Sequence, residues 1–359
     1  MDNQIFLIHL GRRNAGPRIL YRVAEVLSEN GYLAGLFFSR NKNHGIVEFD
    51  NFRNSKSIKT YSTFLGFIFS IFTLPIKSLI ILLYIKNTGS KKIMFLMPHM
   101  WDFFLIPFLS LFGRFHIIYW VHDAKPHPGD SKIASFMSHV IAIKYANIIV
   151  SLSQFVTDSL KTSKKVIQIK HPVDSDFQSH TKLIKDSSSP KLIFFGRLVK
   201  YKGLERLKGA WDKFQNQHVN SYLMIAGNGR QEYIFDIFKT SKNVIFKIQY
   251  LEEYEVQSLL QEYDVLVIPY DEASQSGVLA QAIENGIRYV ATPVGALREQ
   301  NRIFGGGIIA KDMSIDSYVE ALNEACAIDK LEIKESGQLH DWRHEIKFLI
   351  KELEINFKD

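Results

Sequence analysis

The chain has 359 residues, of which 46% are hydrophobic and 23% charged, and its formal net charge is +7. This composition excludes a disordered or fibrous protein, and the length suits two domains of roughly 150 to 200 residues each. A single cysteine, Cys326, excludes an intrachain disulfide, and the N-terminal stretch shows no basic segment or cleavage signal. We therefore expect a cytoplasmic protein. Its positive charge favours an anionic partner: nucleic acid, an acidic membrane face or a phosphorylated ligand.

In the first half of the chain, short apolar runs alternate with segments of helical period. Such alternation predicts parallel strands joined by crossover helices. The predicted strands are residues 5–10, 92–98, 115–121 and 148–153, and the predicted helices are residues 18–30, 101–112, 131–146 and 155–163.

An apolar segment at residues 61–85 is long enough to span a bilayer. It contains Pro75, Lys77 and several hydroxyl residues, which disfavours a transmembrane helix. The segment could lie on an anionic membrane face, or it could form a helix pair packed inside the N-terminal domain. The first interpretation draws on the basic residues around it, which are Arg53, Lys56, Lys59, Lys86, Lys91 and Lys92.

A second series of the same kind follows a polar, serine-rich linker, with a boundary near residues 171–190. Its predicted strands are residues 191–196, 221–227, 244–248, 264–270 and 289–295, and its predicted helices are residues 203–215, 230–241, 252–263 and 277–286. We therefore expect an α/β fold of two Rossmann-like domains, residues 1–175 and 190–338, that face a cleft. The charged amphipathic helix at residues 339–359 has no strand after it and should dock on a surface.

Two loops of the second domain carry residues suited to a phosphorylated sugar. Arg197 and Lys202 follow the first strand, at the edge where parallel sheets bind ligands, and two cations can clamp a diphosphate. The stretch "DEASQSGVLAQAIENG" offers Glu272 to sugar hydroxyls, and then a helix start whose dipole attracts phosphate. That helix start comprises Ser276, Gly277 and Val278. Taken alone, these residues also fit solvated basic side chains and an ordinary serine cap.

The order and spacing of five segments resemble the donor-binding half of family 4 nucleotide-sugar glycosyltransferases, which have the GT-B fold. The segments are "FFGRLVKYKGLERLKGA", "LMIAGNGRQ", "LLQEYDVLVIPY", "EASQSGVLAQAIENG" and "YVATPVGALREQ". The resemblance implies that Arg197 and Lys202 hold the donor diphosphate and that residues 272–281 hold its sugar and ribose. It also implies retention at the anomeric carbon and a C-terminal helix that crosses back to the N-terminal domain. The resemblance is looser over the N-terminal half.

This sequence departs from the family pattern at one of its two carboxylates. Glu272 matches the first, but the position that follows a spacing of seven residues holds Ala280. Counting back from Gly286 instead places Gln281 where the second acid belongs. An amide can still bond ribose hydroxyls, although it lacks the charge that strengthens such bonds.

The N-terminal half contributes its own candidates. His122 and Asp123 end a predicted strand, with His127 in the same polar loop, and Asp123 could orient an acceptor hydroxyl or take its proton. In the family, a histidine after this strand often touches the donor sugar. Gly11 and Gly16, after the first strand, would let backbone approach the donor, although no G-x-G-x-x-G motif is present.

The sequence thus predicts a metal-independent, hexosyltransferase-type retaining glycosyltransferase that uses a UDP- or GDP-linked sugar. Its acceptor would be a lipid-linked or surface glycan precursor, and no nucleic acid, metal ion or other cofactor is expected. Catalysis would rest on His122, Asp123, Arg197, Lys202 and Glu272. Two alternatives stay open. One is a nucleotide-sugar epimerase on the same fold, and the other is a non-catalytic sugar- or membrane-binding relic, which Gln281 favours.

Overall fold

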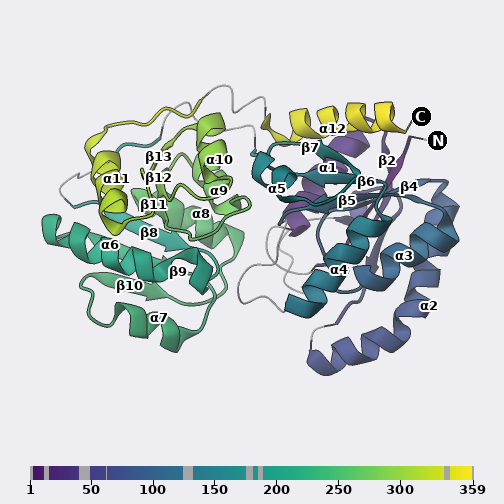
Figure 1. Cartoon of the computed structure of the whole chain (residues 1–359), viewed down its shortest axis with the longest axis horizontal. Helices are drawn as coiled ribbons and strands as arrows, with labels where there is room; N and C mark the ends of the chain where they lie inside the picture. The colour runs from purple at the N-terminus through teal and green to yellow at the C-terminus, as the bar shows by residue number, and fades with distance from the viewer. Residues whose placement is uncertain are drawn as a thin grey trace. The chain divides into compact units, whose positions relative to one another are not determined.

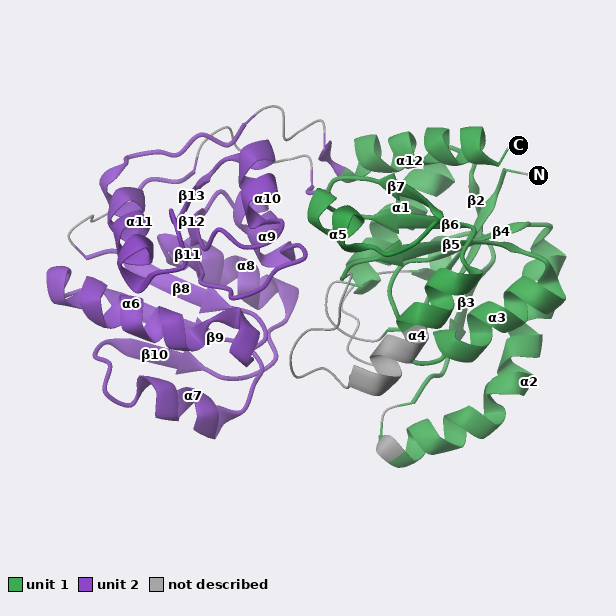
Figure 2. Ribbon diagram, viewed as in Figure 1, with its two compact units in different colours: residues 1–126, 130–170, 342–359 green, residues 127–129, 171–341 purple. Residues whose placement is uncertain are grey.

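The structure is a computed structural model of the whole chain, and two compact units divide it (Figure 2). Unit 1 comprises Met1–Pro126, Asp130–Lys170 and Trp342–Asp359, and unit 2 comprises His127–Gly129 and His171–Asp341. The structure describes residues 3–11, 16–39, 49–61, 63–123, 132–174, 181–184, 189–334 and 340–357.

Unit 1 is built on a seven-stranded sheet in the order β3-β2-β1-β4-β5-β6-β7, with every pairing parallel. Its strands are β1 (Ile5–His9), β2 (Leu33–Ser39), β3 (Ser55–Ile58), β4 (Lys92–Phe95), β5 (His116–Val121), β6 (Ile148–Ser151) and β7 (Lys165–Gln168). Its helices are α1 (Gly16–Glu29), α2 (Phe64–Thr88), α3 (Asp102–Gly113), α4 (Lys132–Tyr145), α5 (Gln154–Ser159) and α12 (Trp342–Asn356), with a 3₁₀ turn, η1 (Phe49–Asn51).

Helices cover both faces of this sheet, so its central strands are continuous apolar runs, as parallel sheets require. In Figure 1, α1 and α12 lie on one face and α2, α3 and α4 on the other. Two apolar clusters correspond to these faces, one containing Leu20 and Ile346, the other Phe6 and Leu105.

The C-terminal helix α12 belongs to unit 1. Its buried side chains recur at helical spacing, from Trp342 through Ile346 to Leu353, and they join the α1 side of the core. Polar contacts fix its two ends: Arg343 pairs with Glu29 at 2.8 Å, and the Tyr32 hydroxyl donates to Glu354 at 2.7 Å. The chain therefore returns to its first unit after completing the second.

Unit 2 has a six-stranded sheet in the order β10-β9-β8-β11-β12-β13, again parallel throughout. Its strands are β8 (Lys191–Phe195), β9 (Tyr222–Ala226), β10 (Val244–Lys247), β11 (Val265–Ile268), β12 (Arg288–Ala291) and β13 (Gly307–Ile309). Its helices are α6 (Leu204–Gln217), α7 (Gln231–Phe238), α8 (Glu253–Glu262), α9 (Gly277–Glu284), α10 (Leu297–Phe304) and α11 (Ile315–Ala327), with a 3₁₀ turn, η2 (Lys200–Lys202). The predicted fold class, two Rossmann-like α/β domains with the C-terminal helix on the first, is confirmed.

The segment at residues 61–85 forms one long helix rather than the helix pair considered above. Helix α2 is capped by Thr63, whose side chain accepts from the Gly66 amide at 3.0 Å, and it continues through Pro75. One side of α2 packs into unit 1 through Leu74, Ile81 and Ile85. The helix-pair interpretation is therefore wrong in its number of helices, although one side of the segment does pack inside unit 1. The membrane interpretation stays a prediction.

Candidate functional site

The strand order of unit 2 reverses beside β8. From β8 the chain goes to β9 on one side, and only later to β11 on the other. Loops that leave neighbouring strands at such a point diverge, and the crevice between them is where open α/β sheets bind ligands. The two loops at this point are residues 196–203 and 269–276. The first carries Arg197 and Lys202, and the second leads into residues 272–281, which the sequence predicts to bind the donor sugar and ribose.

Two tyrosines hold the predicted cations in place. The Arg197 guanidinium donates to the Tyr201 hydroxyl, and the Lys202 Nζ lies 3.5 Å from the centroid of the Tyr270 ring. The Lys202 Nζ also lies 5.3 Å from the centroid of the Tyr201 ring. Each contact is of the cation–π or hydrogen-bonding kind that orients a long basic side chain. The structure thus brings Arg197 and Lys202 together around Tyr201.

The two loops are tied to each other through backbone. The Asp271 amide donates to the Tyr201 carbonyl at 2.9 Å. Gly203 has a φ of 72°, and a Cβ built on it would lie 1.8 Å from the Pro269 carbonyl oxygen. Only glycine permits both this conformation and this approach. Lys202 is therefore placed by a turn that packs directly on the end of β11.

This close approach gives a stability prediction. We expect Gly203→Ala to lower the free energy of unfolding of unit 2 by about 2 to 4 kcal/mol, because the new methyl group must displace the Pro269 carbonyl and the residue keeps a left-handed φ. Urea unfolding of the full chain measures the change. Gly277→Ala is the matched control, since nothing lies within 4 Å of a Cβ there. Equal stability of both variants would contradict the packing described.

The start of α9 is fixed from two directions. Ser276 caps the helix, with its Oγ accepting from the Leu279 amide at 3.2 Å. The buried Gln300 side chain, from α10, accepts from the Ser276 amide at 2.9 Å and donates to the Ser276 carbonyl at 3.2 Å. First-turn amides have no partner inside a helix, and Gly277 is exposed at this end. The helix start is thus held in place by protein contacts.

The helix start also lies beside the first loop. A Cβ built on Gly196 would be 3.7 Å from the Val278 Cγ2. Arg197, Lys202 and the N-terminus of α9 therefore converge at one edge of the sheet. Two cations and a helix dipole there make this edge electropositive and suited to a diphosphate.

The two sugar-binding candidates differ in exposure. Glu272 is exposed and lies two residues beyond Tyr270, in the second loop. On α9, Ala280 packs in the core at 4% exposure, whereas Gln281 is only half-buried. Between the two alignments of the second carboxylate, Gln281 is therefore the residue whose side chain a ligand could reach. Its role in ribose binding stays a prediction.

In unit 1, the corresponding reversal falls between β1 and β4. Gly11 and Gly16 both face the His9 imidazole, which is buried at the end of β1. A Cβ built on Gly11 would lie 2.8 Å from the His9 Cε1, and one built on Gly16 only 2.4 Å away. The close neighbour of both glycines in this structure is thus a side chain of the protein.

His122 lies at the carboxyl end of β5 and is buried. Its Nε2 lies 2.7 Å from the Leu96 carbonyl oxygen. Because a carbonyl only accepts, this nitrogen carries the proton. Burial lowers the pKa of His122, which the Leu96 bond and the Asp123 charge partly offset, so the imidazole is neutral at pH 7. Asp123 is half-buried beside it, whereas His127 lies outside the described residues.

Sequence reasoning missed several residues that organise these edges. Tyr201, Tyr270 and Gln300 were not singled out, and neither was Asp102. The carboxyl group of Asp102 is buried after β4 and accepts from the His99 amide at 2.7 Å. Burial raises its pKa to about 8, so it is largely protonated at neutral pH. Of these four residues, only Tyr270 could have been found from sequence, because it directly follows the predicted strand "DVLVIP".

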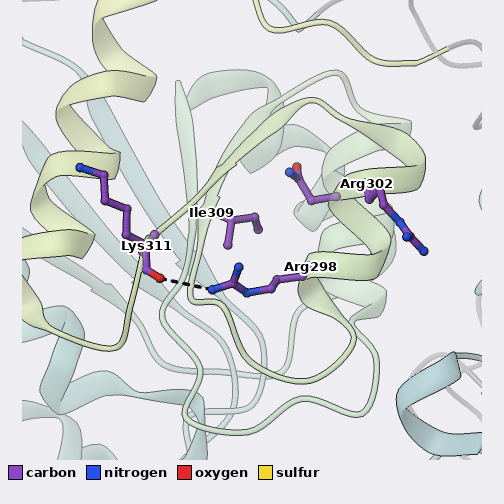
Figure 3. A pocket seen from close by; sticks show the side chains of 6 residues that line it. Arg298, Arg302, Ile309 and Lys311 are labelled. Carbon is purple, nitrogen blue, oxygen red and sulfur yellow. Dashed lines mark hydrogen bonds between the residues drawn. The ribbon is translucent and has the colours of Figure 1, made fainter.

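A further hollow in unit 2 contains none of the predicted donor residues. It encloses about 400 Å³ and is lined by α10 and the segment after β13 (Figure 3). Arg298 donates to the Lys311 carbonyl at 3.2 Å, and the Lys311 ammonium pairs with Glu320 at 2.9 Å. Two of its three basic side chains, those of Arg298 and Lys311, are thus engaged by the protein itself. Among the described residues, no group of three or more His, Cys, Asp and Glu side chains is placed to hold a metal ion.

Residues 175–336 match the family model described as Glycosyl transferases group 1, a stretch that includes every predicted donor residue of unit 2. A curated relative is the "Uncharacterized glycosyltransferase YqgM" of Bacillus subtilis (strain 168), 21% identical over 227 residues. That alignment covers 60% of this chain and 62% of the relative, so the chain matches less than two thirds of its length.

Solved structures resemble the whole chain. Sucrose-phosphate synthase (tll1590) from Thermosynechococcus elongatus aligns with a TM-score of 0.74 at 14% identity, covering 99% of both chains. Anabaena Alr3699/HepE in complex with UDP-glucose gives 0.65 at 12% identity over 99% of this chain and 97% of that one. UDP-GlcNAc 2-epimerase from Methanocaldococcus jannaschii gives 0.62 at 13% identity over 98% and 99%. These likenesses place the fold in the GT-B class.

Proposed function

We propose that the protein is a retaining glycosyltransferase that moves a hexosyl group from a UDP- or GDP-linked sugar to a hydroxyl acceptor. One observation carries the proposal: Arg197, Lys202 and the start of α9 converge at the strand reversal of unit 2, inside the segment that matches the glycosyl transferase model. The binding of UDP-glucose that is stated for Alr3699/HepE supports a nucleotide-sugar donor.

The chemistry follows from charge. As the bond between sugar and phosphate breaks, negative charge grows on the departing diphosphate. Arg197, Lys202 and the dipole of α9 are positioned before that charge develops, so they stabilise the transition state without reorganising. In this scheme the two cations supply the role that a metal ion fills elsewhere, and metal independence is part of the proposal. Glu272 and Gln281 would bond the hydroxyls of the donor.

The acceptor is proposed to be a lipid-linked or surface glycan precursor, with the protein in the cytoplasm and peripheral at an anionic membrane face. Asp123 is the proposed base or orienting group for the acceptor hydroxyl. His122, neutral and bonded to Leu96, would orient the loop that carries Asp123.

A competing function is suggested by the epimerase among the structural neighbours. An epimerase would convert the sugar of its donor with no acceptor present. A relic without catalysis would bind nucleotide weakly and turn nothing over. Gln281, which replaces a carboxylate of the family pattern, is the feature of unit 2 that favours the relic.

The test begins with UDP, GDP and their sugar conjugates in a thermal-shift panel. We expect one nucleotide series to raise the melting temperature, because a ligand at a hundredfold excess over its Kd stabilises the folded state by about 2.7 kcal/mol. The stabilising donor is then incubated with and without lipid-linked acceptors, with EDTA in a parallel arm. Transfer only with acceptor, unchanged by EDTA, is the expected result. Conversion of the donor sugar alone would establish the epimerase, and no shift with any nucleotide would support the relic.

A further inference from the structure

The exposed side of α2 is a continuous apolar stripe. The exposed residues recur at helical spacing from one end of the helix to the other. They are Leu65, Ile68, Phe69, Phe72, Ile76, Leu79, Ile80 and Leu83, with exposures from 38% to 76%. Figure 1 shows α2 along the outside of unit 1, beside α3, whose Leu111 and Phe112 are 60% and 66% exposed. An apolar surface of this extent marks an interaction site.

The segment around α2 also holds the excess charge of the chain. Residues 51–101 contain seven lysines and arginines and no aspartate or glutamate, so the remaining basic and acidic residues are equal in number and the net charge of +7 resides here. One member of this set is not part of the surface: the Lys92 side chain is buried, with its Nζ 3.2 Å from the Asn3 side chain and 4.7 Å from the Phe357 ring. Lys92 is thereby excluded from the basic surface that the sequence suggested.

A groove of about 460 Å³ is lined both by lysines of the basic segment and by apolar residues of the α2 stripe. Among its lining residues are Lys59 and Lys77, together with Phe69 and Ile80 of the stripe. The Lys77 Nζ lies 4.6 Å from the Trp101 ring centroid and 3.5 Å from the Lys59 carbonyl oxygen. Burial, and next the charge of Lys59, lower the pKa of Lys77. A bound anion would relieve the repulsion between the two ammonium groups.

We propose that this groove binds the phosphate of an anionic membrane lipid between Lys59 and Lys77 while the stripe of α2 lies in the bilayer surface. The stripe extends over about 27 Å at 1.5 Å per residue, the length of a helix lying in the interface. Helix α2 is long and apolar enough to cross a membrane, with a mean hydropathy of 2.1. Its buried side, however, is anchored in the core by Ile81 and Ile85 at 0% exposure, which favours an in-plane position.

Lipid suits this face better than a second copy of the chain. A symmetric dimer formed through α2 would bring the same acid-free, basic segment of each copy together, and like charges facing each other are repelled. An anionic bilayer supplies both the apolar phase and the opposite charge. The proposal is independent of the donor assignment, because membrane binding requires no turnover.

The experiment measures co-sedimentation of the full chain with vesicles of phosphatidylcholine alone or mixed with phosphatidylglycerol. Binding should require phosphatidylglycerol and weaken with salt. Lys59→Gln with Lys77→Gln should reduce partitioning about tenfold to thirtyfold, since each surface lysine contributes about a factor of five. Lys161→Gln with Lys164→Gln, two exposed lysines elsewhere in unit 1, is the control of equal charge and should lose clearly less.

The apolar half is tested by Phe69→Ser with Phe72→Ser, which should abolish binding. Phe155→Ser with Phe348→Ser removes two exposed phenylalanines from other helices of unit 1 and should not abolish binding.

Equal loss of vesicle binding in the test and control pairs would overturn the proposal. So would release of the protein from vesicles by millimolar glycerol 3-phosphate, which would identify a free-phosphate site. A dimer of the lipid-free protein that Phe69→Ser with Phe72→Ser dissociates would identify a second copy as the occupant. The thermal shift that nucleotides induce is measured on the same variants. A variant that loses vesicle binding but keeps this shift shows that membrane binding and donor binding are separate, so either proposal can fail alone.

Discussion

Replacing Arg197 and Lys202 together by alanine is expected to leave a folded protein with almost no transferase activity. A charge-assisted hydrogen bond to phosphate contributes roughly 1.5 to 3 kcal/mol, so the pair should account for roughly a hundredfold to ten-thousandfold in turnover and donor affinity combined. Turnover should fall along with affinity, because charge on the diphosphate increases towards the transition state. Steady-state kinetics with the identified donor, alongside a melting curve, provide the measurement.

Two variants sharpen this test. Lys200→Ala removes an exposed lysine from the same turn and should leave the kinetics almost unchanged. Arg197→Lys should restore activity only in part, because one ammonium cannot reproduce the two-pronged geometry of a guanidinium. If the folded double variant kept full turnover and donor affinity, the donor site would lie elsewhere and the proposed function would fail with it.

The second large effect is expected at Asp123 and His122. Asp123→Ala should lower turnover on the order of a hundredfold, while nucleotide affinity stays within a few-fold, because the residue acts on the acceptor hydroxyl rather than on the diphosphate. Asp123→Asn keeps the size of the side chain and removes its basicity, and it should be equally slow. His122→Ala should also be slow, with an added loss of stability, since it leaves the buried Leu96 carbonyl without its donor.

These variants separate two roles. If Asp123 acts as a base, Asp123→Asn lacks that base at every pH and stays slow. If Asp123 only orients the loop, the isosteric amide should replace it. Full turnover of Asp123→Asn would therefore remove the assignment of Asp123 as a base. Wild-type turnover in both alanine variants would exclude this loop from the chemistry altogether.

All the central strands except β2 could be predicted from sequence, whereas of the four edge strands only β10 could. Strands such as "IFLIH" and "VLVI" are buried on both faces and read as apolar runs. The edge strand β3 reads "SKSI" and the opposite edge strand β7 reads "KVIQ", neither of which is fully buried. Half-solvated strands of four residues carry no distinctive pattern, so β3 and β7 were not expected. The first sheet was expected with four strands instead of seven, because β2, which has seven residues and is fully buried, was also missed.

The site shows a similar division. The location of Arg197, Lys202 and Ser276 at one edge of the sheet could be predicted because each follows a strand within eight residues. Gln300 could not, because it lies 24 residues from Ser276 and reaches it only through the packing of α10. Residues that touch a ligand often lie in sequence motifs, whereas the residues that position them are brought close only by the tertiary fold.

The bidentate contact between Gln300 and Ser276 has a consequence for the entropy of binding. A residue whose amide and carbonyl are both held loses its backbone freedom during folding, not during ligand binding. The dipole of α9 therefore has a fixed direction, and an anion that binds there does not have to order the helix start. In the proposed function, part of the affinity for the donor would thus be set by the Gln300 side chain before the donor binds.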